Sequence, residues 1–353
     1  MRLIVTGHKG YIGPVFARHV AERRLGWQIT GIDAEFFATQ LSGLDPAAYF
    51  HRELRADVRA LGDDVLRDAD AVVYLAAVSN DPMGSEFETA TMQINAAAAV
   101  AMAERCRRLG VKRFVFASSC SIYGAAGLTP RTEGDALNPL TTYARSKVKA
   151  ENELRPLADG TFSITCLRFA TACGASPRLR LDLVLNDFVA SAVQAGRIDV
   201  LSDGSPWRPL IHVEDMARAI EWALSRTGSP FLSINVGSHK WTWQIGNLAQ
   251  DVARVLEKVD VSANKAAQPD NRSYRVDFSL FRQLAPDHQP QKQFDVAVRE
   301  LRDQISRIDF GGLPFRASPH LRLNVLRELK AANRLSQDLR WTAGQPAELA
   351  VAK

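Results

Sequence analysis

The order of apolar runs along the chain constrains the fold more than any single motif does. Apolar runs of strand length alternate with segments of helical period over roughly the first half of the chain: RLIVT, WQITGID, AVVYLAA, KRFVFAS and FSITCLRF. Strands that are apolar throughout must be covered on both faces, and the intervening segments can supply that cover. The alternation therefore predicts an α/β protein built on a Rossmann-type, doubly wound parallel sheet.

The rhythm loosens after the fifth run, where prolines and irregular stretches interrupt it. We predict a Rossmann-type sheet domain from residues 1–169 plus 212–236, because one further strand and helix return to the sheet there. Residues 170–211 plus 237–353 are predicted to form a smaller C-terminal lobe, together with the tail. The tail holds one more predicted helix, HLRLNVLRELKAANRL, but no motif.

The composition narrows the class of protein. The 353 residues are 46% hydrophobic and 24% charged, which is typical of a folded globular chain. The 44 basic residues exceed the 39 acidic ones without forming a long basic run, so we expect an anionic small molecule and no nucleic acid as partner. No apolar segment is long enough to span a bilayer, and no secretion signal precedes the first strand. We expect a cytoplasmic protein with no membrane partner.

The cysteines suggest no metal site. The chain has four cysteines: Cys106, Cys120, Cys166 and Cys173. They form no C-x-x-C motif, and no pair of histidines lies near them in the sequence. We therefore expect reduced thiols, no disulfide framework and no bound metal.

A glycine-rich stretch directly follows the first predicted strand. In TGHKGYIG, Gly7, Gly10 and Gly13 form a G-x-x-G-x-x-G spacing that opens a helix. Such glycines allow a tight turn and let backbone N–H groups at a helix N-terminus approach a diphosphate. Asp33 ends the second strand, where a carboxylate can accept hydrogen bonds from ribose hydroxyls and would repel a 2′-phosphate. The pattern favours NAD over NADP, although Lys9 could meet a 2′-phosphate.

A tyrosine and a lysine stand four residues apart in NPLTTYARSK. This spacing puts Tyr143 and Lys147 on one face of a helix, about one turn apart. The pair alone is compatible with two solvated side chains or with a catalytic pair, so other motifs have to decide between them.

Several motifs occur together in one order along the chain: TGHKGYIG, Asp33, ADV at 56–58, YLAA at 74–77, Asn95, SSCSIYG at 118–124, YARSK at 143–147 and WRPLIHVED at 207–215. Over about the first 280 residues, this set resembles the extended short-chain dehydrogenase/reductase superfamily. Within it, the set is similar to the NAD-dependent nucleotide-sugar epimerase/dehydratase family, of the UDP-glucose 4-epimerase-like kind. The resemblance implies that the domain of residues 1–169 plus 212–236 binds NAD. It implies further that the lobe of residues 170–211 plus 237–353 binds the substrate, a nucleotide-diphosphate sugar. It also implies a homodimer formed through the helices after Asp81 and around Tyr143.

The resemblance implies roles for individual residues as well. The catalytic residues would be Ser119, Tyr143 and Lys147. The cofactor would contact the glycine loop, the strand ends and the catalytic helix: Gly7, Lys9, Gly10, Tyr11, Ile12, Gly13, Asp33, Asp57, Val58, Leu75, Ala76, Ala77, Asn95, Tyr143 and Lys147. The substrate would contact Ser79, Ser119, Ser121, Tyr143, Thr171, Asn186, Arg208 and Arg272.

The implied chemistry needs these residue types. Removing a hydride from a sugar carbinol requires a base for the hydroxyl proton, and a tyrosine with an ordinary pKa of about 10 is a poor base at neutral pH. We expect the ammonium of Lys147, together with the positive nicotinamide, to lower the pKa of Tyr143. Ser119 is expected to hydrogen-bond the same oxygen from the C-terminal end of a strand.

The stretch SSCSIYG at 118–124, called the serine loop below, distinguishes between the candidate reactions. Family members that remove water look like TDEVYG here, with Asp and Glu as acid and base, and the decarboxylases also carry a glutamate. This chain has Cys120 and Ser121 instead, which disfavours both reactions, and Cys120 is expected to be a small packed side chain. Epimerisation at carbon 4 and reduction of a 4-keto-6-deoxysugar remain, with a non-catalytic dinucleotide-binding protein as a third alternative. Asp33 favours a tightly held NAD and hence the epimerase.

The predicted substrate contacts depart from the family pattern at two points. Arginine's planar fork suits a diphosphate, and Arg208 and Arg272 match positions that hold one in the family. Thr171, however, stands where relatives have an asparagine, and RPLIHV replaces RDYIHV. His212 is expected to pack or to cap the following helix. Neither the base nor the sugar is predicted.

Overall fold

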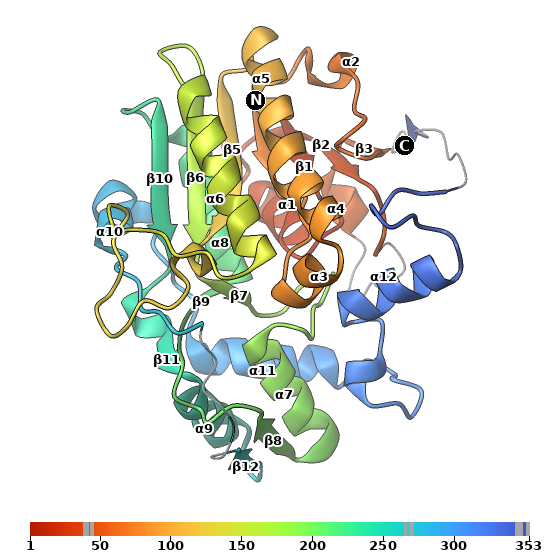
Figure 1. Ribbon diagram of the computed structural model, residues 1–353, viewed down its shortest axis with the longest axis vertical. Helices are drawn as coiled ribbons and strands as arrows, with labels where there is room; N and C mark the ends of the chain where they lie inside the picture. The colour runs from red at the N-terminus through yellow and green to blue at the C-terminus, as the bar shows by residue number, and fades with distance from the viewer. Residues whose placement is uncertain (38–41, 43–45, 265–266, 268–271, 343–348, 351–353) are drawn as a thin grey trace.

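The computed structural model covers residues 1–353 and describes all of them except 38–41, 43–45, 265–266, 268–271, 343–348 and 351–353. A sheet in the order β10-β6-β5-β4-β1-β2-β3-β13 forms its centre (Figure 1). The strands are β1 (Arg2–Thr6), β2 (Gln28–Asp33), β3 (Arg52–Arg55), β4 (Ala71–Tyr74), β5 (Arg113–Ser119), β6 (Ser163–Phe169), β10 (Phe231–Val236) and β13 (Leu349–Ala350). All neighbours pair in parallel except β13, which runs antiparallel to β3. The predicted doubly wound fold is confirmed.

Helices cover both faces of this sheet. Successive side chains of a strand point to opposite faces, so strands that are apolar throughout need cover on both. Leu3 and Val5 of β1 belong to the core beneath two of these helices, and Ile4 belongs to the core beneath the other two. The first pair is α1 (Gly13–Glu22) and α8 (Val213–Ser225), and the second is α5 (Ala98–Arg108) and α6 (Thr142–Leu154). Shorter elements complete the second face: α2 (Asp63–Leu66), α3 (Asp81–Glu86), α4 (Glu88–Met92) and a π-helical turn over Gln93–Ala97.

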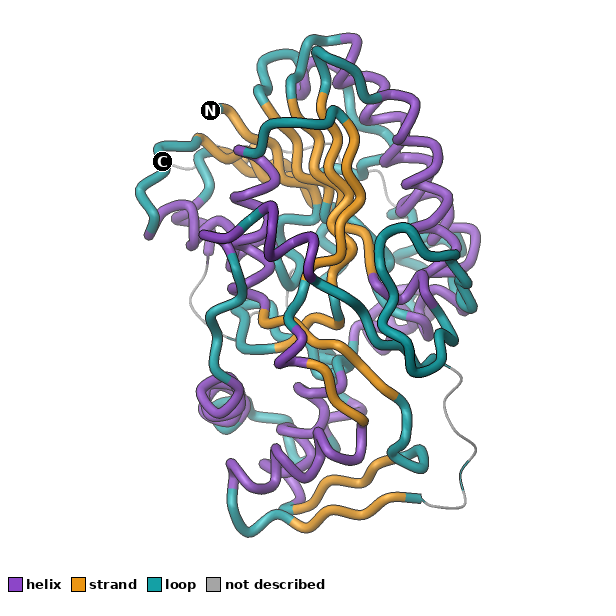
Figure 2. Tube along the Cα trace, turned by 90° about the vertical axis from the view of Figure 1, so that its left-hand side faces the viewer, coloured by secondary structure: helices purple, strands orange, loops and turns teal. Residues whose placement is uncertain are grey.

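A smaller lobe lies below the sheet in Figure 1 and has its own apolar core. Its helices are α7 (Val184–Ala195), α9 (Ile245–Leu256) and α11 (Phe294–Ile305), and α10 (Ser279–Leu284) packs back toward β10. Its strands are β7 (Thr171–Cys173), β9 (Trp207–His212) and β11 (Thr242–Gln244) in one sheet, and β8 (Arg197–Val200) with β12 (Asp260–Ala263) in another. Figure 2 shows this second pair at the far end of the lobe.

The C-terminal tail differs from the prediction that grouped it with the lobe. Its helix α12 (Arg322–Ala331) buries Leu326, and the turns that follow bury Leu335 and Leu339, all in the core under α5 and α6. The backbone then joins the central sheet through β13. The tail is therefore part of the sheet domain. The helical period of the sequence predicted α12 but did not indicate which surface of the protein this helix covers.

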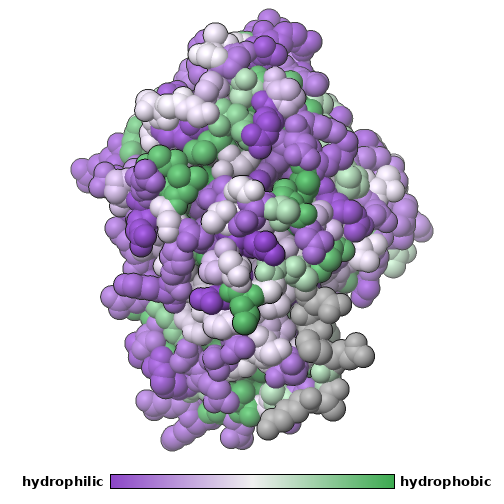
Figure 3. Space-filling model, turned by 60° about the vertical axis from the view of Figure 1, so that its left-hand side comes forward, coloured by the Kyte–Doolittle hydropathy of each residue, from purple (hydrophilic) through white to green (hydrophobic). Residues whose placement is uncertain are grey.

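The face of the molecule drawn in Figure 3 is mostly polar. Figure 3 shows hydrophilic side chains over most of one face, with separate apolar patches between them, as expected for a folded chain. No helix among the described residues is both long enough and apolar enough to cross a membrane.

Candidate active site

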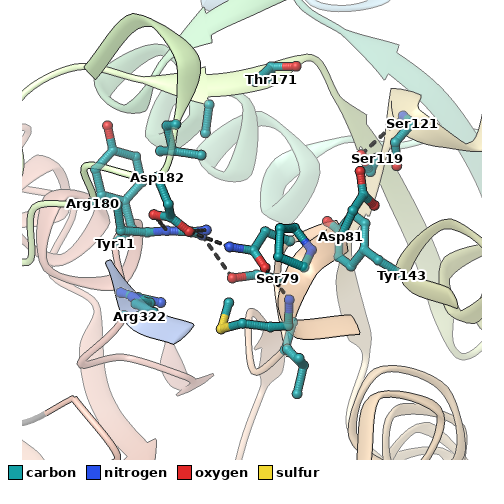
Figure 4. Close-up of a pocket in the computed structure, with 18 of the residues that line it drawn as sticks. Tyr11, Ser79, Asp81, Ser119, Ser121, Tyr143, Thr171, Arg180, Asp182 and Arg322 are labelled. Carbon is teal, nitrogen blue, oxygen red and sulfur yellow. Dashed lines mark hydrogen bonds and ion pairs between the residues drawn. The ribbon is translucent and has the colours of Figure 1, made fainter. Parts of the chain in front are cut away.

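A cavity of about 630 Å³ opens where the parallel strands end, between the sheet domain and the lobe. Its wall combines the loop after β1, the ends of β2, β4 and β5, and the start of α6 with residues of the lobe and of the tail. In doubly wound folds, ligands bind at this edge, where the strand order reverses beside the first strand. Figure 4 shows side chains from both parts converging on this space.

The glycine loop brings its backbone to the cavity in a way that side chains would prevent. Gly7 has a φ of +69°, and a Cβ there would lie 2.7 Å from the backbone nitrogen of Ala76. A Cβ on Gly13 would lie 2.6 Å from the Cα of His8, and closer still to its carbonyl oxygen. The loop therefore lies tight against the start of α1 and the end of β4. Such a cradle fits a dinucleotide diphosphate.

Asp33 is held beside this loop. Its Oδ2 accepts a hydrogen bond from the backbone N–H of Lys9 at 3.0 Å, and its Oδ1 accepts one from that of Glu35 at 2.7 Å. The ammonium of Lys9 turns to other carboxylates, donating to Glu35 at 2.5 Å and lying 3.6 Å from Glu53. Lys9 is not part of the cavity wall. Its charge is thus already paired, which weakens the case for a 2′-phosphate contact.

The other predicted cofactor contacts fall into two groups. Most line the cavity: Gly7, Gly10, Tyr11, Ile12, Asp33, Asp57, Val58, Leu75, Ala76, Ala77, Tyr143 and Lys147. Asn95 instead lies behind the wall, where its amide accepts from Val78 N at 2.8 Å and donates to Val78 O at 2.9 Å. Because both ends of this buried amide are used, Asn95 holds the loop after β4 in place, and the cavity does not reach it. Gly13 also lies behind the wall.

The predicted catalytic residues all line the same cavity, and Figure 4 shows Ser119 beside Tyr143. Ser119 ends β5, while Tyr143 and Lys147 lie on the first turns of α6. Thr141 starts this helix by accepting the N–H of Ala144 at 3.2 Å. The Lys147 nitrogen lies 5.6 Å from the centre of the Tyr143 ring and donates to Ala117 O at 2.7 Å. The same-face arrangement predicted from the spacing of four is confirmed.

Burial controls the ionisation of this pair in the protein alone. It raises the pKa of Tyr143 to about 12, although a hydrogen bond with Ser119 acts in the opposite direction. It also lowers the pKa of Lys147 to about 7. The prediction that Lys147 lowers the pKa of the tyrosine is therefore not met by the protein alone. A ligand that brings positive charge beside Tyr143 would favour its phenolate.

The serine loop presents no carboxylate to the cavity at the two positions after Ser119. Cys120 is buried, its thiol donates to Arg168 O at 3.0 Å, and burial raises its pKa, so it is the packed side chain that the sequence predicts. Ser121 does line the cavity, and its hydroxyl is buried without a hydrogen-bond partner in the described part of the chain. Its N–H donates to Ser119 Oγ at 3.2 Å.

The predicted substrate contacts also divide. Ser79, Thr171, Arg208 and Arg272 line the cavity together with the serine loop and Tyr143. Asn186 does not. Its Oδ1 accepts from Gly174 N at 3.0 Å, and its Nδ2 donates to Tyr11 OH at 3.1 Å and to Arg180 O at 2.8 Å. This fully buried amide joins the lobe to the glycine loop, so the structure gives it a bracing position away from the cavity.

His212 has the role expected of it. Its Nδ1 accepts the backbone N–H of Glu214 at 3.3 Å at the start of α8. Burial lowers its pKa to about 3, which keeps the ring neutral at physiological pH.

Several polar cavity residues were not found from the sequence, among them Asp81, Arg180, Asp182, Tyr274 and Arg322. Arg180 forms two hydrogen bonds to Asp182, at 2.9 and 2.7 Å, and a third to Ser79 Oγ at 2.8 Å. The charges in RLRLD at 178–182 were the one available signal for this pair. Asp81 pairs with Arg272 and lies beside Tyr143 in Figure 4.

Together, the glycine cradle, Asp33 and the Ser–Tyr–Lys set define a dinucleotide-dependent enzyme of the short-chain dehydrogenase type. Residues 3–237 match the model of the NAD dependent epimerase/dehydratase family. The chain belongs to this family and is an NAD-dependent enzyme. When bound, NAD supplies a hydride acceptor and a positive nicotinamide.

Named relatives agree with this membership. A UDP-glucose 4-epimerase of Azospirillum brasilense is 30% identical, over 77% of this chain and 81% of its own length. A dTDP-glucose 4,6-dehydratase of Streptomyces niveus is 27% identical, over 64% of this chain and 69% of its own. The structure of MoeE5 in complex with UDP-glucuronic acid and NAD has the same fold, with a TM-score of 0.74 at 24% identity over 87% of this chain and 99% of that one.

Proposed function

We propose that this protein epimerises a nucleotide-diphosphate sugar at carbon 4 through a transient 4-keto sugar. The observation that carries the proposal is the pairing of an intact Ser119–Tyr143–Lys147 set with a serine loop that has no carboxylate at positions 120 and 121. The set supports oxidation and reduction at a carbinol. Without an acid and a base on the loop, loss of water from the keto sugar lacks its expected catalysts.

Each residue of the set has a separate task. Tyr143, as phenolate, accepts the proton of the hydroxyl on carbon 4 and returns a proton to that oxygen after the sugar has turned over. Ser119 donates a hydrogen bond to the same oxygen and so holds it against Tyr143. Lys147 places an ammonium below the tyrosine ring when it is protonated. Because its pKa is lowered to about 7, its charge state depends on the ligands beside it.

The lobe side of the cavity supports a nucleotide diphosphate as the anchor of the substrate. Arg208 and Arg272 both line it, and guanidinium groups match the paired oxygens of a diphosphate. Relatives whose names or structures include UDP-glucose and UDP-glucuronic acid add support for this class of substrate. The base and the sugar stay open. A homodimer through the helices after Asp81 and around Tyr143 remains part of the proposal.

The first test is to denature the purified protein and to identify the released dinucleotide by mass spectrometry. Stoichiometric NAD would support a resident redox cofactor. Nucleotide hexoses carrying deuterium at carbon 4 should then give epimers that keep the deuterium, with no net consumption of NADH. A dinucleotide-free protein that binds NADPH more tightly than NADH would overturn the proposal and favour ketoreduction.

Tyr143→Phe tests the assignment of the base. Removing the hydroxyl should lower turnover by about 1,000-fold, within the range for loss of general base catalysis, while NAD stays bound. Tyr49→Phe is the matched control, because Tyr49 lies outside the cavity wall and should leave turnover unchanged. Near-normal turnover of Tyr143→Phe would remove the central residue of the mechanism.

A further inference from the structure

A buried arginine of the C-terminal tail faces the cavity without a counter-ion. Arg322, at the start of α12, is only 6% exposed and lines the cavity. In the described part of the chain its guanidinium has no hydrogen bond and no ion pair, and it lies 4.6 Å from the centre of the Phe37 ring. A buried charge without a partner is unfavourable, so an arginine in this position needs an anion.

The charges around Arg322 do not supply that anion. Arg180 lies nearby and occupies both oxygens of Asp182, which also accepts from Asn80. Burial and the charge of Arg180 lower the pKa of Arg322 to about 9, and Asp182 and Asp33 offset this only in part. This stretch of the wall is therefore short of negative charge. Figure 4 shows Arg322 on the same side as Tyr11 and Arg180, away from Tyr143.

The position of Arg322 identifies which end of the cavity it serves. Its ring contact, Phe37, follows β2, and Asp33 ends that strand. The rest of the tail is fastened to the same region. Trp341 Nε1 donates to Ala34 O at 2.7 Å, and Arg59, paired with Asp57, donates to the carbonyl oxygens of Asp338 and Leu339 at 2.6 and 2.7 Å. The tail thus closes the dinucleotide end, far from the serine loop.

We propose that Arg322 binds the diphosphate of the dinucleotide, opposite the glycine loop, so that the C-terminal tail is a working part of the cofactor site. The forked guanidinium matches two diphosphate oxygens and would there receive the counter-charge that the protein lacks. The inference needs only the NAD dependence of the enzyme and holds for any reaction at carbon 4. Its failure is therefore distinguishable from failure of the proposed epimerisation.

The test compares Arg322→Gln with Arg327→Gln, an exposed residue of the same helix that pairs with Glu86. The first readout is the ratio of NAD to protein after purification, which should fall only in Arg322→Gln. The second is the affinity of the dinucleotide-stripped full chain for ADP-ribose, adenosine and UDP. Loss of charge-assisted bonds to a diphosphate should weaken ADP-ribose binding by about 10- to 100-fold and leave adenosine binding unchanged. Arg322→Lys should recover part of the loss.

Stability supplies an independent readout. Because Arg322→Gln removes an unpaired buried charge, the dinucleotide-free variant should melt no lower than the wild type, while the rise in melting temperature caused by NAD should shrink. Equal losses for adenosine and ADP-ribose would mean that Arg322 only shapes the wall. A loss confined to UDP would assign it to the substrate diphosphate. Unchanged ADP-ribose binding, or a dinucleotide-free variant that melts well below wild type, would also overturn the proposal. If Arg322→Gln does not fold, Arg322→Lys decides by the same ratio of ADP-ribose to adenosine affinities.

Discussion

The glycine loop and the C-terminal tail reach the same end of the cavity from opposite ends of the chain, and they do so by different physical means. The loop uses backbone alone, since Gly7 and Gly13 leave no room for a Cβ beside Ala76 and His8. The tail uses side chains: Leu326 and Leu339 bury apolar surface against the sheet domain, and Trp341 hydrogen-bonds to Ala34.

This difference explains why one region has a recognisable pattern and the other has none. A backbone cradle tolerates few residue types, so its glycines must recur at fixed spacing. A packed helix tolerates many apolar residues of similar volume, so its contacts leave only a helical period in the sequence. Regions of a binding site can therefore be equally close to a ligand and unequally visible in the sequence.

The largest effect on NAD affinity is expected in the loop. In Gly13→Ala, the added Cβ would meet the backbone of His8, which cannot move aside as a flexible side chain could. We expect the affinity for NAD to fall by at least about 100-fold, equivalent to roughly 3 kcal/mol. The ratio of bound NAD to purified protein measures it. Gly134→Ala is the control, since a Cβ there meets nothing within 4 Å. Near-normal NAD content in Gly13→Ala would show that the loop backbone can shift to make room for the added Cβ, which would contradict this prediction.

The fold was predictable because its signal is repeated. Each of the buried strands, such as Leu3–Val5 in β1, repeats the same apolar pattern, and the helices between them can only cover the faces. The catalytic set was predictable for a different reason. Tyr143 and Lys147 share one helix, so their separation in sequence fixes their separation in space.

The rest of the site depends on packing between distant segments, which local sequence does not encode. Asn95 and Asn186 match family positions, yet the amide of each hydrogen-bonds to backbone and side-chain groups behind the wall, and only three-dimensional contacts reveal this. Arg322 is the reverse case. It stands in a helix with no motif and reaches the cavity only because Leu326 and Leu339 seat that helix on the sheet domain.

The second prediction tests whether apolar packing holds the tail helix on the sheet domain. Leu339 is fully buried and also lines the cavity. Leu339→Ala should lower the free energy of unfolding by about 2–5 kcal/mol, through lost burial and the remaining void. NAD affinity should fall only a few-fold, because the glycine cradle is untouched. Urea unfolding and NAD titration measure the two quantities. Leu313→Ala, at an exposed leucine, is the matched control. A 100-fold loss of NAD affinity in Leu339→Ala would make the tail as essential as the loop.

The third prediction concerns Lys147, at the other end of the cavity. It tests whether the titration of this residue is independent of how the tail is packed. Burial lowers the pKa of Lys147 from 10.5 to about 7. Between these values the unfolded chain binds a proton that the folded chain does not, so the stability of the dinucleotide-free protein should rise with pH, by up to about 1.4 kcal/mol per unit. Below pH 7 this contribution has no slope. Lys147→Met should flatten the rise between pH 7 and 8.5 in urea unfolding, whereas Leu339→Ala should keep it. A slope that survives in Lys147→Met would assign the titration to another group.

The smallest effect concerns the outer fastening of the tail. Arg55, at the end of β3, holds its guanidinium 5.0 Å from the centre of the Trp341 ring. A double-mutant cycle with Arg55→Ala and Trp341→Leu should give a coupling of about 0.5–1 kcal/mol, as for partly exposed cation–π pairs. NAD affinity should hardly change in Arg55→Ala, because the Trp341–Ala34 hydrogen bond remains to hold the tail. Zero coupling would leave the fastening to that hydrogen bond, to Arg59 and to the apolar contacts of the tail. The tail has no sequence motif, which is expected if several weak and replaceable contacts hold it in place. A coupling well above about 1 kcal/mol would contradict that view.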